Sequence, residues 1–174
     1  MLEYLGAAPT SCRFSPTKYT WARMLAEVER IRHEPGAEHR NRLGILLSSS
    51  APWADRTRTL TPTLWALLNV IPAGDVQPPH RHNSVALDLA VDAPSGGGVY
   101  TMMSQALGPD GRLVDPVRVE WVAGAAFVTP PGWWHSHHND TEEDAWVLPL
   151  QDAGLHTHMQ TLDIRFAPRP AAKA

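Results

Sequence analysis

The chain has 174 residues, a formal net charge of −3, and 43% hydrophobic and 19% charged residues. These values suit a single globular domain and exclude a disordered or highly charged chain. No basic block points to a nucleic-acid or anionic membrane partner. The longest apolar run, about ten residues around "LWALLNVIPA", is too short to cross a bilayer.

The cysteine content and the first residues predict a cytoplasmic protein. The one cysteine, Cys12, can form neither an internal disulfide nor a thiolate cluster, so a reducing compartment is expected. The N-terminus shows no basic segment followed by an apolar stretch, which is the pattern of a secretion signal.

One helix is predicted near the start of the chain, from Pro16 to His33. Ser15 and Pro16 form a typical helix opening, in which a capping hydroxyl is followed by a proline. Apolar residues then recur three and four positions apart, so they would form one stripe along the helix. The pair of Pro35 and Gly36 is expected to end it.

After this helix the pattern changes to short strands separated by turns rich in glycine and proline. The stretch "SVALDLAVD" shows the strand pattern most clearly, because Val85, Leu87, Leu89 and Val91 alternate with smaller or polar residues. About nine or ten such strands after one helix predict an all-β sandwich or closed barrel. The other predicted strands include "RLGILLS", "TLWALLNVI", "GGGVYTMMSQ", "PVRVEWV", "AAFVTP", "AWVLPLQ" and "LHTHMQTLDIRF".

The same pattern divides the chain into three segments. Residues 1–36 are expected to form an N-terminal extension with the helix, and residues 37–168 a single barrel. Residues 169–174 are expected to be a loose tail.

Five histidines fall in two short stretches, "PPHRHNSVALDL" and "PPGWWHSHHND". His80 and His82 are two positions apart, so on a strand both imidazoles point the same way. His135 lies on another predicted strand, and these three side chains would make a metal site that keeps open positions. The alternative is structural, because a His-x-His pair alone is a weak signal and most histidines lie on the surface or are hydrogen-bonded.

The spacing of these histidines matches both sequence motifs of the cupin barrel. In the first motif a glycine is followed by five residues and then by His-x-His, as Gly74 is by His80 and His82. The second motif, G-x5-P-x-G-x2-H-x3-N, is matched by Gly124, Pro130, Gly132, His135 and Asn139. The chain therefore resembles the cupins. That resemblance implies an all-β double-stranded β-helix, or jelly-roll barrel, with an N-terminal α-helix.

Cupins usually carry a fourth ligand, a glutamate shortly after the His-x-His pair. The stretch "NSVALDLAVD" contains no glutamate, and Asp88 is its first acid. The expected ligands are therefore His80, His82 and His135. Iron(II) held by three histidines can bind substrate and dioxygen together, as in ring-cleaving and thiol dioxygenases. Zn, Mn and Ni are the alternative metals.

A closer resemblance is to the catalytic domain of gentisate 1,2-dioxygenases and of the related salicylate and hydroxynaphthoate dioxygenases. The segments "TPTLWALLNVIPAGDVQPPHRH", "VYTMM" and "VTPPGWWHSHHND" resemble specific stretches of that family, and "DAGLHTHMQTLDIRF" is a weaker match. The resemblance implies a ring-cleaving dioxygenase of aromatic catabolism, with a small aromatic substrate, dioxygen and iron(II). The family usually has two cupin domains per chain, and this chain has room for one.

The resemblance also assigns residues to a substrate pocket. His137 matches a family histidine near the substrate, where it can hydrogen-bond a ring hydroxyl or move a proton. Trp65 matches a tryptophan of the pocket, and Asn69 stands where the family has a glutamine that touches the substrate. Either Arg40 or Arg42 matches one arginine of an upstream pair.

Two departures from the family predict a substrate other than gentisate. Asp88 stands in "ALDL", where the family has an arginine that grips the substrate carboxylate. An aspartate would repel a carboxylate and favour a cation, an amine or a neutral donor. His156 stands where the family has an acid. The expected catalytic residues are His137, Asn69 and Asp88, and the expected pocket residues are Trp65, Asn69, Asp88, His137 and His156.

Some of these residues also have structural interpretations. Arg81 lies between two ligands, so it would face away from them and form a salt bridge. His138 would face solvent, and His156 with His158 could be hydrogen-bonded strand residues. Asp88 could pair with an arginine or accept a hydrogen bond from a ligand histidine.

Two other functions remain open on the sequence. A metal-dependent isomerase, lyase or hydrolase would use Zn, Mn or Ni as a Lewis acid. The missing glutamate counts against that function, while Asp88 keeps it open. A non-catalytic cupin that binds a small ligand is the third possibility, and the complete three-histidine set counts against it. Cupins tend to pair through barrel edges, so a homodimer or larger homo-oligomer is expected, with the helix covering a barrel face or a neighbour.

Overall fold

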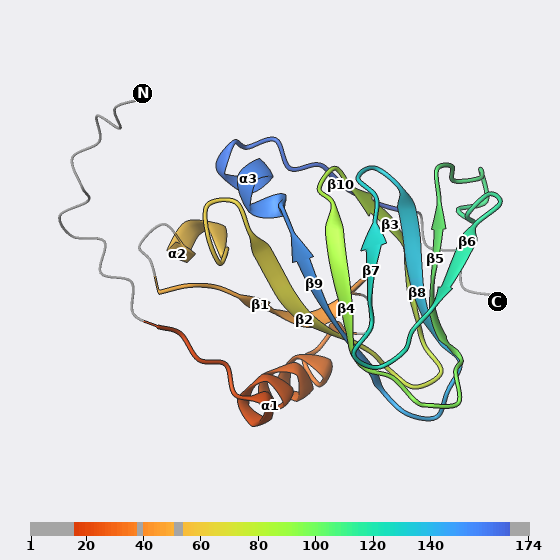
Figure 1. Ribbon diagram of the computed structural model, residues 1–174, viewed down its shortest axis with the longest axis horizontal. Helices are drawn as coiled ribbons and strands as arrows, with labels where there is room; N and C mark the ends of the chain where they lie inside the picture. Colours follow the sequence, from red (N-terminus) through yellow and green to blue (C-terminus); the bar gives the residue numbers. More distant parts are fainter. Residues whose placement is uncertain (1–15, 38–39, 51–53, 168–174) are drawn as a thin grey trace.

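The computed structural model describes residues 16–37, 40–50 and 54–167 (Figure 1). Three helices and ten strands occur in these ranges. In chain order they are α1 (Trp21–Arg32), β1 (Leu43–Leu47), α2 (Ala54–Thr57), β2 (Trp65–Ile71), β3 (Val76–His82), β4 (Ala86–Asp92), β5 (Val99–Ser104), β6 (Val117–Glu120), β7 (Ala126–Thr129), β8 (Trp134–Asn139), β9 (Ala145–Gln151), α3 (Ala153–His158) and β10 (Ile164–Phe166).

The strands form two antiparallel sheets that face each other. The first sheet has the order β1-β2-β9-β4-β7, and the second has the order β10-β3-β8-β5-β6. From β3 to β10 the chain crosses repeatedly between the sheets, as Figure 1 shows. This topology is a jelly roll, in which two sheets enclose one interior. It confirms the predicted all-β barrel with an N-terminal helix.

The alternation in β4 has its apolar side on the outside of the barrel. Asp88 is 3% exposed, whereas its neighbour Leu87 is 45% exposed. Ala86 and Ala90 are buried with Asp88, so the small and polar residues of this strand face the interior. The aliphatic residues belong to the outer face of the first sheet. The barrel interior is therefore polar enough to hold a site.

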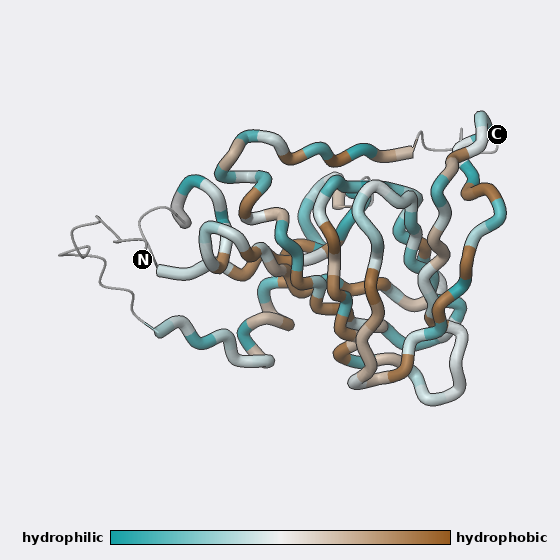
Figure 2. Tube along the Cα trace, turned by 45° about the horizontal axis from the view of Figure 1, so that its top comes forward, coloured by the Kyte–Doolittle hydropathy of each residue, from teal (hydrophilic) through white to brown (hydrophobic). Residues whose placement is uncertain are grey.

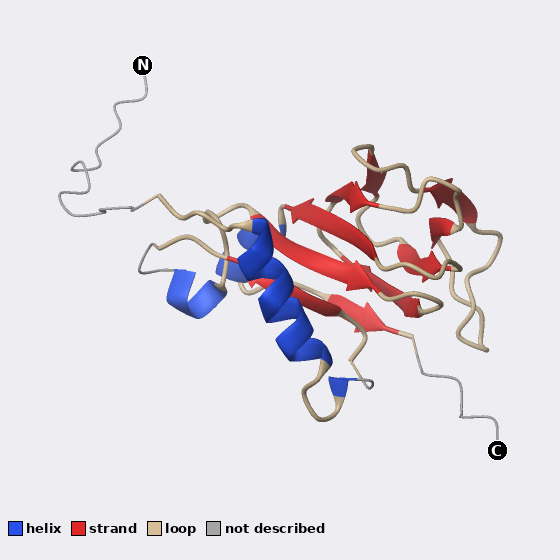
Figure 3. Cartoon of the chain, turned by 90° about the horizontal axis from the view of Figure 1, so that it is seen from below, coloured by secondary structure: helices blue, strands red, loops and turns tan. Residues whose placement is uncertain are grey.

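Helix α1 covers part of that apolar outer face. Val28 packs with Leu68, Val70 and Trp146 of β2 and β9 in a hydrophobic cluster, and Trp21 meets Trp146 edge-on at a centroid distance of 5.4 Å. Figure 3, seen from below, shows the helix lying across the first sheet. The expectation that the helix would cover a barrel face is confirmed.

The helix begins later than the sequence pattern predicted. Thr20 is its N-cap, with the hydroxyl accepting a hydrogen bond from the backbone N–H of Arg23 at 3.4 Å. Residues 16–20 are not helical, and Ser15 lies outside the described residues. The predicted start at Pro16 is thus wrong, because the capping hydroxyl of Thr20 directly precedes the apolar stripe. At the other end Gly36 adopts a φ of 82°, which favours glycine.

The segment "LHTHMQTLDIRF" was predicted to be one strand, and this prediction is wrong. The segment contains the end of α3 and, after a turn, the short strand β10. The helix packs tightly against the segment before β2, since a Cβ on Gly154 would lie 2.6 Å from the carbonyl carbon of Thr63. The backbone N–H of Leu155 also donates to the carbonyl of Thr63 at 3.2 Å. These tertiary contacts override the strand pattern.

A second hydrophobic cluster fills one end of the barrel interior. It includes Ile71, Val99, Trp121 and Val147, with Phe127 packed against it. Figure 2 shows hydrophobic segments on the central strands and hydrophilic residues on many of the connecting turns. No helix in the described ranges is long and apolar enough to cross a membrane.

Candidate metal centre

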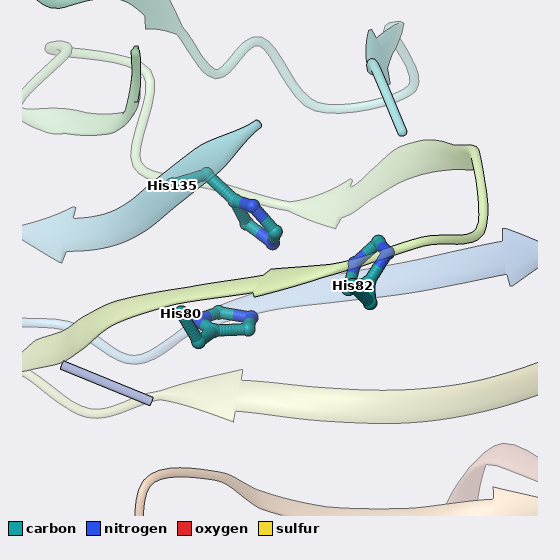
Figure 4. A group of neighbouring side chains, drawn as sticks. All are labelled: His80, His82 and His135. Carbon is teal, nitrogen blue, oxygen red and sulfur yellow. The ribbon is translucent and has the colours of Figure 1, made fainter. Parts of the chain in front are cut away.

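Three histidines from two neighbouring strands face one point inside the barrel. His80 and His82 come from β3, and His135 comes from β8, where it lies opposite His80 in the antiparallel register. One ring nitrogen from each lies within 4.8 Å of the others, and all three side chains are buried. Figure 4 shows the rings converging. The predicted ligand set is thus brought together as expected.

The backbone fixes which ring nitrogen each of these histidines offers. In every case Nδ1 lies within hydrogen-bond distance of a carbonyl oxygen two residues away, so Nδ1 carries the proton and donates. The lone pair of Nε2 is then the one that each ring can offer to a metal ion. The carbonyls belong to Pro78 at 3.1 Å, Ser84 at 2.8 Å and Trp133 at 3.0 Å.

The chemistry of these donors fits a metal ion. Nε2 of His82 is buried and has no hydrogen-bond partner in the described part of the chain. Burial lowers the pKa of His82 to about 4 and that of His135 to about 3. Burial also lowers the pKa of His80 well below its ordinary value. The rings are therefore neutral at pH 7, which is the form that binds metal.

Arg42, just before β1, reaches the same centre. Its Nη2 lies 3.0 Å from Nε2 of His80, and its guanidinium lies 5.9 Å from the ring centroid of Trp65. Burial lowers the pKa of Arg42 to about 10, an effect that the charge of Asp88 opposes. Arg40, the other candidate, bonds Glu34 at 2.6 Å on the surface. Between the two, the structure places Arg42 beside the metal ligands.

A pair of amides lies behind His80. Asn69 is buried on β2, and its Nδ2 donates to Oε1 of Gln77 at 2.8 Å. Nε2 of Gln77 lies 3.4 Å from Nε2 of His80. Asn69 thus reaches the centre through Gln77, which the sequence analysis did not single out. Gln77 is three residues before His80, so strict strand alternation would have placed it on the opposite face, and an irregularity in β3 between the two residues brings it inside.

Asp88 is buried in the barrel interior on β4. Thr129 donates its hydroxyl to Oδ2 of Asp88 at 2.7 Å. Burial raises the pKa of Asp88 to about 6, while the bond from Thr129 and the charge of Arg42 act against the shift. Among the described residues no arginine lies within ion-pair distance of this carboxylate, so the expected arginine pairing is not found.

His137 lies beside the three ligands and is also buried. Its ring centroid is 5.7 Å from that of His135 and 6.0 Å from that of His80. Its Nδ1 faces the hydroxyl of Thr101 at 2.7 Å, and that hydroxyl also accepts a hydrogen bond from Nε1 of Trp121 at 2.8 Å. Thr101 and Trp121 were not recognised as site residues from the sequence.

His156 and Trp65 lie further from the ligands. His156 is on α3, where its Nδ1 is 3.2 Å from the hydroxyl of Thr161 and 3.4 Å from Nδ2 of Asn83. Asn83 directly follows β3, so His156 lies at the end of the barrel where that strand ends. Trp65 begins β2 and contacts the site through Arg42.

Two polar residues next to the ligands make different contacts from those expected. The guanidinium of Arg81 lies 5.3 Å from the ring centroid of Trp134, a cation–π contact in place of the predicted salt bridge. His138 does not simply face solvent. It is half-buried, stacks on Tyr100 at 4.8 Å, and bonds the hydroxyl of Ser136 at 2.8 Å.

Comparison with known proteins shows similarity to ring-cleaving dioxygenases, although no family model matches the chain. A gentisate 1,2-dioxygenase from Aquipseudomonas alcaligenes is 37% identical over 110 residues, which are 62% of this chain and 26% of the relative. A 5-aminosalicylate 1,2-dioxygenase from a Comamonas species is 27% identical over 146 residues, 82% of this chain and 34% of the relative.

The fold matches that of a solved enzyme. A salicylate 1,2-dioxygenase from Pseudaminobacter salicylatoxidans aligns with a TM-score of 0.71 and 22% identity, covering all of this chain and 45% of the other. The chain thus spans less than half the length of the relatives it matches. With its two antiparallel sheets, the barrel has the jelly-roll fold of that enzyme, and the spacing of its three clustered histidines is the one that resembles the cupin motifs.

Proposed function

We propose that this cupin, which resembles gentisate and salicylate dioxygenases, is a non-haem iron(II) ring-cleaving dioxygenase acting on a small aromatic substrate other than gentisate. The observation that carries the proposal is the set of three buried, neutral imidazoles, His80, His82 and His135, that face one point without a carboxylate ligand. The names of the curated relatives, gentisate and 5-aminosalicylate dioxygenases, support it.

The three Nε2 atoms would hold iron(II). Bound there, the metal supplies the redox chemistry that inserting oxygen into an aromatic ring requires. Three neutral protein ligands keep more positions open than a site with an added carboxylate, so substrate and dioxygen can be accommodated together. The barrel walls supply a dry environment, because all three ligand side chains are at most 3% exposed.

Two charged groups inside the barrel define the proposed substrate class. Among the described residues no carboxylate pairs with Arg42, so its guanidinium is available to a substrate carboxylate beside the metal. Asp88 would accept a hydrogen bond from an amino or hydroxyl group of the substrate. We therefore propose an aromatic acid with such a donor, and the relative named for 5-aminosalicylate has a substrate of this kind.

His137 would act on the substrate rather than on the metal. Burial lowers the pKa of His137 well below its ordinary value, so at pH 7 the ring is neutral and can donate one hydrogen bond. It lies next to His135 and His80 without sharing their backbone contacts. In this position it can hold an oxygen atom of the ring substituents. Asn69 would keep Gln77 against His80 and so support the ligand.

Oxygen uptake tests the proposal. The protein would be loaded anaerobically with iron(II) and mixed with air and a panel of gentisate, salicylate, aminosalicylates, aminophenols and hydroquinones. Uptake is expected with at least one of them other than gentisate, and it should be lost in His135→Ala. His138→Ala is the matched control, because His138 lies on the same strand, stacks on Tyr100, and should leave uptake intact.

If the protein binds one iron per chain but takes up no oxygen with any substrate, the proposed dioxygenase function would be rejected. A Lewis-acid lyase, isomerase or hydrolase would then be the function to test, with Zn, Mn or Ni in the same site. Failure to bind any divalent metal would instead favour a non-catalytic ligand-binding cupin.

We also propose that the chain assembles as a homo-oligomer. Beyond α1, the outer face of the first sheet leaves Leu87 and Val128 largely exposed. Light scattering during size-exclusion chromatography measures the mass, and a monomer at micromolar concentration would contradict this assembly.

A further inference from the structure

The four buried histidines of the barrel interior differ in what faces their Nδ1 atoms. For His80, His82 and His135 the neighbours include a backbone carbonyl oxygen, which can only accept a hydrogen bond. The hydroxyl of Ser84 also lies 3.0 Å from Nδ1 of His82, but it donates to Oε1 of Gln151 and so leaves the His82 tautomer to the carbonyl. For His137 the neighbour is the hydroxyl of Thr101, which can either donate or accept. The tautomer of His137 is therefore decided by whatever else contacts that hydroxyl.

Trp121 decides whether the Thr101 hydroxyl donates to Nδ1 of His137 or accepts from it. An indole N–H is a donor only, and Nε1 of Trp121 donates to the Thr101 hydroxyl at 2.8 Å. The hydroxyl proton of Thr101 must then point elsewhere, and Nδ1 of His137 at 2.7 Å is the other side-chain atom that it contacts. Thr101 thus donates to Nδ1, and the neutral ring of His137 keeps its proton on Nε2.

The three partners are held rigidly enough to maintain this arrangement. Thr101 and His137 are directly opposite each other in the β5–β8 register, and Trp121 is tied to β5 by its backbone N–H, which donates to the carbonyl of Val99 at 2.8 Å. Trp121 also meets the His137 ring edge-on at 5.5 Å. None of the three side chains is more than 3% exposed, so water cannot easily replace a partner.

We propose that Thr101 and Trp121 are positioning residues that fix His137 as the Nε2–H tautomer. In this form His137 presents a hydrogen-bond donor to the barrel interior and has no lone pair on Nε2 for the metal. The fold thereby gives His137 a different role from the other three histidines: they offer a lone pair to a metal ion, and His137 offers an N–H to the substrate. The tautomer is a property of the fold, whereas its catalytic consequence rests on the proposed dioxygenase function.

Nitrogen NMR of the histidine rings tests the tautomer without any assay of activity. The protein would carry ring-15N histidine and zinc as a diamagnetic metal, and long-range 1H–15N correlations would be recorded. His137→Gln identifies the signals of His137 by their loss. We expect His137 to be protonated at Nε2 and the three ligands at Nδ1. A wild-type His137 protonated at Nδ1 would overturn the proposal.

Variants at Thr101 test the cause. Thr101→Val keeps the shape but removes the donor, so His137 is expected to shift toward the Nδ1–H form or a mixture, whereas Thr101→Ser should retain Nε2–H. Trp121→Phe keeps a ring but removes the N–H, and it should give a mixture. A His137 that stays fully in the Nε2–H form in both Thr101→Val and Trp121→Phe would contradict the proposal.

Kinetics then tests the consequence. With a substrate found by oxygen uptake, Thr101→Val should lower kcat roughly tenfold to a hundredfold with little change in KM or iron content, and Thr101→Ser should restore it. Thr59→Val is the matched control, because Thr59 is also fully buried but bonds Thr57. An unchanged kcat in Thr101→Val would overturn the catalytic part. If no substrate is found, the proposed function fails while the NMR result still decides the tautomer.

Discussion

Arg42 is the residue whose surroundings say most about the substrate. A guanidinium in the interior of a protein is normally paired with a carboxylate, because an unpaired buried charge is costly. In the described ranges Arg42 has only neutral partners within contact, His80 and Trp65. Asp88, the acid that influences its pKa, lies beyond ion-pair distance. This lack of an ion-pair partner supports the proposal that a substrate carboxylate pairs with Arg42.

Replacing Arg42 by methionine should weaken binding of a carboxylated aromatic substrate. Loss of one charge-assisted hydrogen bond is worth about 1.5–3 kcal/mol, so KM is expected to rise roughly tenfold to a hundredfold with a smaller effect on kcat. Steady-state oxygen uptake measures both parameters. Arg40→Met is the control, since Arg40 bonds Glu34 on the surface. Equal effects of the two substitutions would contradict the role of Arg42.

Asp88→Asn should change how stability depends on pH. Because burial raises the folded pKa of Asp88 to about 6 from its ordinary value of 3.8, the folded state holds this proton more tightly than the unfolded state. The contribution of the protonated carboxyl is present below about pH 4 and is lost as the pH rises through 6. The variant is therefore expected to gain about 1–3 kcal/mol over the wild type at pH 8 relative to pH 4. Urea unfolding of both proteins at both pH values measures this gain. If the variant and the wild type differ by the same free energy of unfolding at pH 4 and pH 8, the raised pKa of Asp88 would be rejected.

At the scale of elements, the helix α1 contributes to stability, whereas the second sheet positions the histidines of the candidate metal centre. α1 packs on the outer face of the first sheet, while the metal ligands lie on β3 and β8 of the second sheet. β1 and β2 connect the two regions, because their outer side meets α1 and their chain carries Arg42 and Asn69 to the interior. Damage to the helix should therefore affect stability before it affects the site.

Val28→Ala tests this separation. Val28 is the fully buried residue of α1, and deleting its two methyl groups should cost about 1–2.5 kcal/mol of the free energy of unfolding. Metal content and kcat of the folded protein should stay unchanged. Denaturant unfolding and metal analysis check the two statements. Ala37→Gly, away from the α1 stripe, serves as a control for a small apolar deletion. A loss of metal in Val28→Ala would show that the helix holds the site.

For the molecule as a whole, the metal centre connects segments far apart in the sequence. The proposed ligands come from two strands paired in the middle of the second sheet, and the residues around them come from β2, β4, β5 and the segment just before β1. The unfolded chain does not hold these histidines together, so a bound metal must stabilise the folded state selectively.

Adding zinc should raise the free energy of unfolding by about 2.7 kcal/mol when the free metal is at a hundred times its dissociation constant. Thermal unfolding with and without zinc measures the shift. His82→Ala, which removes the unpartnered Nε2, should abolish it, whereas His156→Ala should not. A zinc-dependent shift that survives in His82→Ala would place the metal elsewhere.

The sequence by itself determined the class of fold and the grouping of three histidines that could bind a metal ion. Strand alternation and turn residues are local signals, and the spacing of His80, His82 and His135 around Gly74 and Gly132 reflects backbone geometry that is also local. Resemblance to the dioxygenases then indicated His137, Asn69 and Asp88 as site residues, and their catalytic roles remain predictions. The predicted start of α1 and the prediction of one strand over residues 155–166 were wrong, because Thr20 and the contact of Gly154 with Thr63 override propensity there.

Only the tertiary structure decided which side chains complete the site. The choice of Arg42 over Arg40 and the pairing of Thr101 with Trp121 depend on contacts between residues that are far apart in the sequence. The position of the Gln77 amide depends on the irregularity in β3 between Gln77 and His80. The clearest case is which face of β4 points into the barrel. The sequence shows that apolar and small or polar residues alternate along this strand, but it does not show which of the two sets is inside. The apolar residues of the first sheet pack against α1 on its outer face, so the face of β4 with Asp88 can point into the barrel interior.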